Sequence, residues 1–159
     1  MSKKRFVVML CLTFLMCFPL TAFAATVNVG VSTQPPIINE DVIFKPDDTS
    51  TPSKSALYTI GDKHSVTGSA THSALYTNKC FKGVTSISYK ITNNRSGDLK
   101  VRLCSYTNSG NVNYGIKTIT IPSKGTTSGS FSELSSTKYY FIEFSAPSNF
   151  NGTIYGNRY

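Results

Sequence analysis

Residues 84–104, VTSISYKITNNRSGDLKVRLC, contain the pattern that decides the fold. Within residues 84–92, Ile87, Tyr89 and Ile91 alternate with polar residues, and apolar and polar side chains alternate again through residues 99–104. A period of two residues is typical of strands that bury one face. Residues 93–98 between the two runs are mostly turn-forming residues. The stretch therefore predicts two strands with a turn between them.

These two strands are expected to pair directly with each other as an antiparallel hairpin. Placing Ile91 opposite Leu99 brings the apolar faces of both strands onto one side. In that register Cys104 points to the other face, opposite Ser86.

Further short strands are expected downstream, and no helical period appears after residue 24. Turn-forming residues separate these strands, which is typical of an all-β protein. We predict a single antiparallel β-sandwich domain, similar to a jelly roll. The further strands are expected at residues 116–121, 128–134, 139–145 and 152–155.

The chain begins like an exported protein. Residues 3–5 are basic, residues 6–20 are an almost unbroken apolar run, and Ala22 and Ala24 have the spacing that signal peptidase requires. We predict cleavage after Ala24. One alternative is an uncleaved membrane anchor, but the apolar run of residues 6–20 is shorter than the roughly 20 residues that span a bilayer. The other alternative is a lipoprotein modified at Cys17.

The mature chain divides into two parts by composition. Residues 25–54 are rich in proline and small polar residues, which favours extended chain, and they are predicted to be a flexible N-terminal arm. Residues 55–159 are predicted to be the β-sandwich domain, and residues 1–24 the signal peptide. No second apolar stretch has spanning length, so no transmembrane segment is expected in the mature chain.

The charge of the mature chain is mildly basic. Removing the three basic residues of the signal from the 16 in the chain leaves 13 against eight acidic residues, a net charge of +5. The lysines are scattered and do not form the clustered stripe of a nucleic-acid binder, so we expect no nucleic-acid partner. Scattered lysines serve solubility and protect strand edges, or attract anionic polymers weakly.

Two cysteines, Cys80 and Cys104, remain after removal of the signal. An exported chain with two cysteines usually joins them, so a disulfide is expected. It would close a loop of about 24 residues and contribute on the order of 3 kcal/mol. The alternative is two separate buried thiols.

No catalytic or metal-binding constellation is evident. The two mature cysteines and the histidines His64 and His72 do not have the spacing of metal ligands. No G-x-S-x-G motif is present. Only Glu133 and Glu143 fall in predicted strands, and nothing in the sequence supports them as the facing carboxylates of a glycosidase. We expect a non-enzymatic protein without metal or cofactor.

Tyrosine is the enriched functional residue, with nine copies and no tryptophan. Exposed tyrosine rings bind sugars and proteins, but tyrosine also suits strands for structural reasons. Tyr89 and Tyr140 alternate in phase with apolar neighbours, which favours the structural interpretation.

Tyr106, Tyr114 and Tyr155 are the better binding candidates, because each is expected near a loop, and of these Tyr106 and Tyr114 are expected at the two ends of one connection. The amides of Asn111 and Asn113 flank these two in the sequence. We predict that these four residues form a small amphipathic platform that binds the ligand.

Several strand-and-turn motifs resemble those of small exported β-sandwich proteins of Gram-positive bacteria. The resemblance rests on residues 87–93, 99–101, 119–122 and 139–147. Their layout is similar to the bacterial pre-peptidase C-terminal domain, a β-sandwich appended to secreted enzymes. The acidic calcium ligands often found in that domain have no convincing match here. The resemblance implies a fold and an extracellular setting, and no activity.

The sequence therefore predicts a secreted, non-catalytic binding module. Its expected partner is a cell-wall polysaccharide or an extracellular protein. The alternative is a secreted effector, such as a toxin, a bacteriocin or an enzyme inhibitor, with Asn108–Gly115 as a candidate inhibitory loop.

Overall fold

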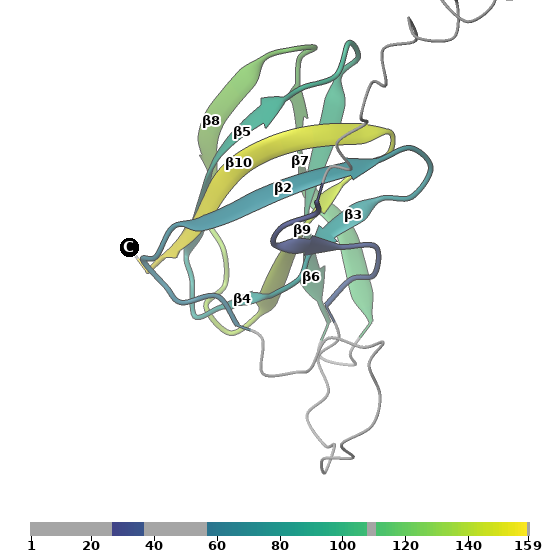
Figure 1. Cartoon of the computed structure of the whole chain (residues 1–159). Helices are drawn as coiled ribbons and strands as arrows, with labels where there is room; N and C mark the ends of the chain where they lie inside the picture. The colour runs from purple at the N-terminus through teal and green to yellow at the C-terminus, as the bar shows by residue number, and fades with distance from the viewer. Residues whose placement is uncertain (1–26, 37–56, 108–110, 159) are drawn as a thin grey trace, which may run out of the picture.

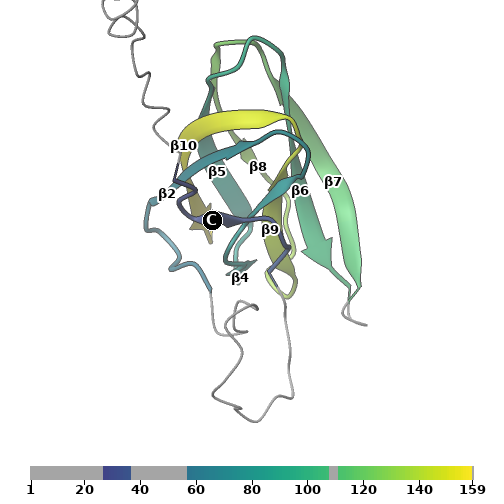
Figure 2. The same ribbon diagram turned by 45° about the vertical axis from the view of Figure 1, so that its right-hand side comes forward.

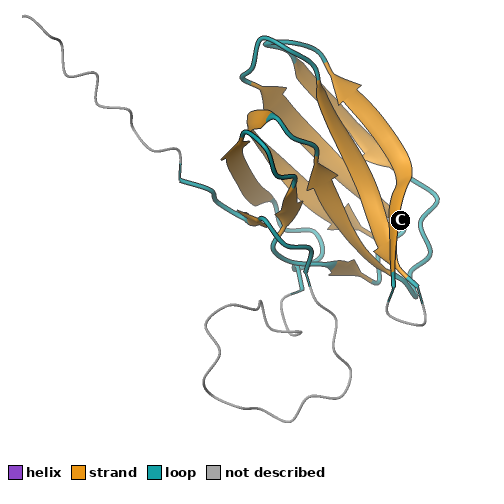
Figure 3. Cartoon of the chain, turned by 90° about the vertical axis from the view of Figure 1, so that its right-hand side faces the viewer, coloured by secondary structure: helices purple, strands orange, loops and turns teal. Residues whose placement is uncertain are grey.

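The computed structural model describes residues 27–36, 57–107 and 111–158. Within these ranges the chain forms ten strands and no helix (Figure 1, Figure 3). Accordingly, no described segment is a helix with the length and hydropathy needed to cross a membrane. The predicted signal peptide, most of the predicted arm and residues 108–110 lie outside the described residues.

The strands form two sheets, and every strand pairing is antiparallel. One sheet has six strands: β1 (Val31–Ser32), β3 (Leu75–Thr77), β4 (Phe81–Lys82), β9 (Tyr139–Phe144), β6 (Leu99–Tyr106) and β7 (Val112–Ile121). The other has four: β2 (His64–Ala70), β10 (Ser148–Asn157), β5 (Ser86–Asn93) and β8 (Thr126–Phe131). Figure 2 shows β2 beside β10 and β6 beside β7. The predicted all-β antiparallel sandwich is confirmed.

The core lies between the sheets and is built from alternate residues of the strands. Ile87 and Ile91 of β5 are fully buried, whereas Lys90 between them is exposed. The ring of Phe144 at the end of β9 stacks on Phe150 of β10, with centroids 3.9 Å apart. Fully burying one such side chain contributes about 1.5–3 kcal/mol. The predicted inward and outward phases of β5, β6 and β9 are correct.

The predicted pairing of the first two strands is wrong. β5 and β6 lie in different sheets. Ile91 pairs with Thr127 of β8 and Gly152 of β10, and Leu99 pairs with Ile121 of β7. The intervening turn therefore crosses from one sheet to the other, and Cys104 does not face Ser86.

A buried asparagine explains why this turn crosses between the sheets. The Asn93 side-chain amide donates to the carbonyl oxygens of Gly97 at 2.7 Å and of Ile121 and Pro122 at 3.2 Å. These bonds hold the start of the turn against the end of β7.

Part of the segment before residue 37 adds to the sandwich. Val31 of β1 is buried and pairs with Thr77 of β3. Val29 forms an isolated bridge with Thr67 of β2. The segment thus contacts one strand of each sheet.

Candidate functional site

The outer face of the six-stranded sheet carries most of the aromatic residues that are not in the core. We call this surface the tyrosine face and define it by its outward apolar and aromatic side chains. They are Tyr76, Tyr106, Val112, Tyr114, Ile116 and Tyr139. These side chains come from four strands of the sheet, β3, β9, β6 and β7.

The strand registers arrange the outward side chains in rows. One row is polar: Tyr76 pairs with Glu143, Glu143 with Arg102, and Arg102 with Thr118. In the next row Cys104 pairs with Phe141. Because the residues of a strand alternate between faces, these side chains all point away from the core.

Phe141 is the centre of the tyrosine face and is fully buried although it points away from the core. The ring of Tyr106 lies 5.2 Å from its centroid and that of Tyr76 lies 6.1 Å away, edge-on. Cys80 and Cys104 complete this small second cluster. The two tyrosines are therefore anchored at their inner edges and half-exposed at their outer edges.

Tyr114 and Ile116 are the most exposed members of the face. Tyr114 is 51% exposed and Ile116 is 38% exposed. The strand is irregular here, because the register of β6 and β7 shifts between Leu103 and Ser105. Gly115 sits in this irregularity with φ of 67°, a left-handed value that favours glycine. The bulge thus presents two large side chains to solvent, as bulges beside functional sites often do.

An ion pair lies within the same face. The Arg102 guanidinium donates to the Glu143 carboxylate at 2.8 Å. The side chain of Glu143 is 6% exposed and that of Arg102 is 39% exposed. Glu143 also accepts a hydrogen bond from the Ser145 hydroxyl at 3.3 Å and a weak one from the Cys104 thiol at 3.9 Å. These bonds fix the carboxylate, and the exposed part of the Arg102 guanidinium can donate hydrogen bonds to a ligand.

The environment of Tyr106 and Tyr76 favours the protonated form of their hydroxyls. Burial raises the pKa of Tyr106, and the nearby Cys80, Tyr114 and Cys104 raise it further. Burial also raises the pKa of Tyr76, with an added contribution from the Glu143 carboxylate. These rings therefore act as neutral hydrogen-bonding groups over the physiological pH range.

The structure brings two of the predicted platform residues together. Tyr106 and Tyr114 share the tyrosine face, but they lie on β6 and β7 and not on loops. Asn113 is exposed on β7 and pairs with Ser105, and Asn111 is exposed just before that strand. The outward side chains of β7 at residues 112, 114 and 116 place Asn113 on the opposite face, so its amide is not directed to the platform.

Sequence reasoning missed four members of this site, Tyr76, Tyr139, Arg102 and Glu143. For the last three the signal was the outward phase of two predicted strands, residues 99–104 and 139–145, in which a polar or aromatic residue faces away from the core, whereas Tyr76 lies outside the predicted strands. That phase identifies the face of one strand. It does not show which strands lie side by side.

The predicted disulfide is not formed: Cys80 and Cys104 are free, buried thiols. Cys104 pairs with Phe141 in β9, and Cys80 precedes β4 on the other side of β9. Two strand spacings separate the cysteines by about 9.5 Å, which exceeds the roughly 7 Å limit for a disulfide. Burial raises the pKa of Cys80 to about 12 and that of Cys104 to about 11. The alternative of two separate buried thiols is therefore correct.

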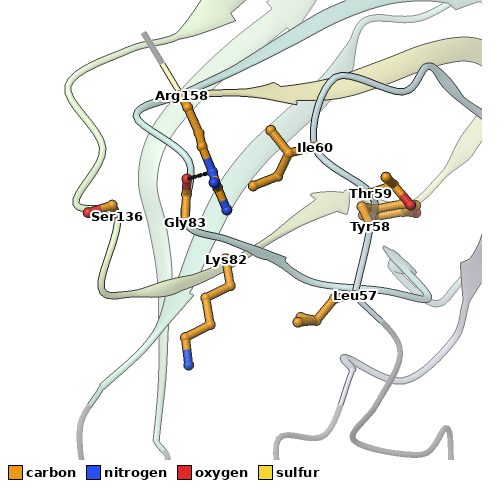
Figure 4. Close-up of a pocket in the computed structure, with 8 residues that line it drawn as sticks. All are labelled: Leu57, Tyr58, Thr59, Ile60, Lys82, Gly83, Ser136 and Arg158. Atoms are coloured by element: carbon orange, nitrogen blue, oxygen red, sulfur yellow. Dashed lines mark hydrogen bonds between the residues drawn. The ribbon is translucent and has the colours of Figure 1, made fainter.

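A shallow pocket adjoins the tyrosine face (Figure 4). It has a volume of about 680 Å³, and its lining includes Leu57, Ile60, Lys82 and Arg158. The Arg158 Nε donates to the Gly83 carbonyl oxygen at 3.2 Å. In Figure 4 the Lys82 side chain extends away from Arg158.

Lys82 connects this pocket to the tyrosine face. Its ammonium group lies 4.2 Å from the Tyr139 ring centroid and donates to the Tyr139 hydroxyl. The two surfaces are therefore continuous. Within residues 27–36, 57–107 and 111–158, no group of three His, Cys, Asp or Glu side chains is arranged to hold a metal ion.

Comparisons with known proteins give only distant similarities. No protein-family model and no curated protein sequence matches the chain. A solved family 6 carbohydrate-binding module, studied by binding sub-site dissection, is 12% identical over 60% of this chain and 74% of that chain, with a TM-score of 0.37. A mutant of a family 29 carbohydrate-binding module is 15% identical over 63% of this chain and 71% of that chain, also with a TM-score of 0.37. A second family 29 mutant is 16% identical, with a TM-score of 0.36 over 63% of this chain and 66% of that chain. Similarities at this level assign no function to this chain.

Proposed function

We propose that this protein is an exported, non-catalytic carbohydrate-binding module and that the tyrosine face binds the ligand. The observation that carries the proposal is the exposure of Tyr114 and Ile116 beside three half-buried tyrosines on one sheet face. Contiguous exposed aromatic and apolar surface on a soluble domain marks an interaction site. The export signal predicted at the N-terminus supports an extracellular setting for this site.

The chemistry of the face suits a sugar. A sugar ring has an apolar C–H face, which packs on an aromatic ring, and hydroxyls around its edge. Tyrosine provides both a ring and a hydroxyl at low entropic cost. The partly exposed Arg102 guanidinium, held by Glu143, adds fixed donors at one edge of the face.

The ion pair favours binding over catalysis. A glycosidase acid or base needs a carboxylate that can exchange protons with the substrate. In this face the Glu143 carboxylate instead accepts hydrogen bonds from Arg102, Ser145 and Cys104. Its role is to orient the arginine.

The test is a glycan array and a cell-wall pulldown with the mature protein, comparing wild type with Tyr106→Ala/Tyr114→Ala. Losing an anchoring aromatic ring typically costs at least about 2 kcal/mol, which is about 30-fold in affinity. Ser132→Ala, at an exposed position outside both surfaces, is the control and should retain glycan binding. Unchanged binding by the double variant would remove the tyrosine face as the site, and the absence of any glycan hit would reject the function.

A further inference from the structure

The outer face of the four-stranded sheet differs chemically from the tyrosine face. Its outward positions on β2, β10, β5 and β8 are serine, threonine and asparagine, apart from one lysine and one tyrosine. The registers align them: Thr153 pairs with Lys90, and Lys90 pairs with Ser128. In the neighbouring row Tyr155 pairs with Ser88, and Ser88 with Ser130.

These rows surround a hollow of about 520 Å³. We call it the hydroxyl hollow and define it by six of its lining residues. They are Lys63, Ser88, Lys90, Ser128, Ser130 and Thr153. Lys90, Ser128 and Ser130 are exposed, so their polar groups are accessible to a ligand.

The charge of the hollow has one sign. Lys63 and Lys90 both line it, and of the residues that the structure describes no carboxylate does, Asp62 beside Lys63 included. Among the described residues neither lysine forms an ion pair, since the two pairs present are Arg102–Glu143 and Lys117–Glu133. Two uncompensated cations in one concave surface attract an anion.

The remaining groups of the hollow add hydrogen-bond donors. The Ser128, Ser130 and Thr153 hydroxyls project from paired strands, whose spacing is fixed by the ladder hydrogen bonds. The Ser88 hydroxyl accepts a bond from the Asn157 amide at 3.0 Å, which leaves its own proton available for donation. Preorganised donors of this kind bind an oxygen-rich ligand with little loss of side-chain entropy.

We propose that the hydroxyl hollow binds an acidic polysaccharide. Carboxylates of the polymer pair with Lys63 and Lys90, and its oxygens accept hydrogen bonds from the strand hydroxyls. The choice of an anionic ligand rests on charge complementarity, and the choice of a polysaccharide rests on the hydroxyl array. The hollow lies on the opposite sheet from the tyrosine face, so this binding is independent of the function proposed above.

The experiment uses the mature protein with polygalacturonate as the probe and dextran as the neutral control polymer. Lys63→Gln/Lys90→Gln is compared with Lys100→Gln/Lys138→Gln, which removes two exposed lysines from elsewhere on the domain. We expect at least a tenfold loss of polygalacturonate affinity for the first pair and less than a twofold loss for the second. Ser128→Ala/Thr153→Val, which keeps the charge, should reduce the affinity about threefold or more.

Any of four results overturns the proposal. Equal losses for the two lysine pairs would indicate diffuse attraction to a basic protein. Failure of the wild type to bind polygalacturonate, or equal affinity for dextran, would reject the ligand class. Tyr106→Ala/Tyr114→Ala should leave polygalacturonate binding intact. Loss of polygalacturonate binding in this double variant would place the polymer on the tyrosine face instead.

Discussion

The side-chain amide nitrogen of Asn93 lies 3.2 Å from the carbonyl oxygen of Ile121, although the two residues are 28 positions apart in the sequence. Asn93 is the last residue of β5 and Ile121 the last of β7, so this bond joins strands that belong to different sheets. The side-chain oxygen of Asn93 also accepts a bond from the Arg95 amide at 3.0 Å. One buried side chain therefore fixes the path between the two layers of the sandwich.

Replacing Asn93 tests this role. Asn93→Ala leaves buried carbonyl oxygens without their donor and should lower the free energy of unfolding by about 2–3 kcal/mol. Asn93→Asp should be more destabilising above the pKa of the new carboxyl, because a carboxylate only accepts hydrogen bonds and would face three carbonyl oxygens. Urea unfolding at pH 7 measures both. Equal stability of the aspartate variant and wild type would show that the amide is not the anchor.

The Arg102–Glu143 pair gives a second prediction. Arg102→Met leaves the Glu143 carboxylate buried without its cation, and should cost roughly 1–3 kcal/mol because the arginine is partly exposed. Glu143→Gln keeps an acceptor for the guanidinium and should cost less. The double variant Arg102→Met/Glu143→Leu should recover part of the loss, since an apolar pair carries no desolvation penalty. With the single variant Glu143→Leu these form a double-mutant cycle measured by urea unfolding, and additive losses would show that the two residues are not coupled.

The faces of the strands could be predicted from the sequence, but their partners could not. The alternation in residues 84–92 and 99–104 identified β5 and β6 and the inward side of each, because the period of two is a local property. Which strand lies beside another depends on contacts far along the chain. Ile91 faces Gly152, 61 positions later, and no local pattern indicates that pairing.

The repeated pentapeptide illustrates the same limit. Residues 73–77 repeat residues 55–59 word for word. Leu75 in the second copy is fully buried on β3, whereas Leu57 in the first is 42% exposed outside any strand. Conversely Tyr58 is buried and Tyr76 is part of the tyrosine face. Identical local sequence received different environments from the tertiary fold, so the sequence alone could not place Tyr76 on the tyrosine face.

Close approach of two strands at Gly152 gives a third prediction. A Cβ at this position would lie 2.4 Å from the Lys90 carbonyl oxygen and 2.9 Å from the Ile91 Cα, which are backbone atoms that cannot move aside. Gly152→Ala should therefore lower the free energy of unfolding by about 1–3 kcal/mol. Gly97→Ala is the control, since nothing lies within 4 Å of its Cβ position. It should be neutral or stabilise by up to about 1 kcal/mol. Thermal unfolding of both variants is the measurement, and similar melting temperatures would contradict the expected clash.

The buried thiols predict loss of stability at alkaline pH. Their pKa is raised from 9.0 to about 12 for Cys80 and about 11 for Cys104, because burial disfavours the thiolate. Between pH 9 and 12 the unfolded chain therefore binds fewer protons than the folded protein, and the free energy of unfolding falls as pH rises. Below pH 9 this contribution is fully present.

Thiol labelling checks the same residues. At pH 8 the native protein should react slowly with iodoacetamide, and the denatured, unreduced protein should yield two thiols per chain. In Cys80→Ala/Cys104→Ala the free energy of unfolding should fall less between pH 9 and 12 than in the wild type. Finding no thiol in the denatured, unreduced protein would mean that the cysteines are joined after all.

The last prediction separates the structural and binding roles of the two central tyrosines. The Tyr106 ring packs 5.2 Å from Phe141, so Tyr106→Ala should lower the free energy of unfolding by about 1–2 kcal/mol as well as weaken binding. Tyr114 is 51% exposed, and Tyr114→Ala should stay within about 0.5 kcal/mol of wild type while reducing glycan affinity. Tyr106→Phe keeps the packing and removes only the hydroxyl, so it should restore stability and show what that hydroxyl contributes to the ligand. Chemical unfolding and glycan titration of the same three variants make the comparison. If Tyr114→Ala destabilised the fold as much as Tyr106→Ala and left binding unchanged, both rings would be structural and the tyrosine face would not be the binding surface.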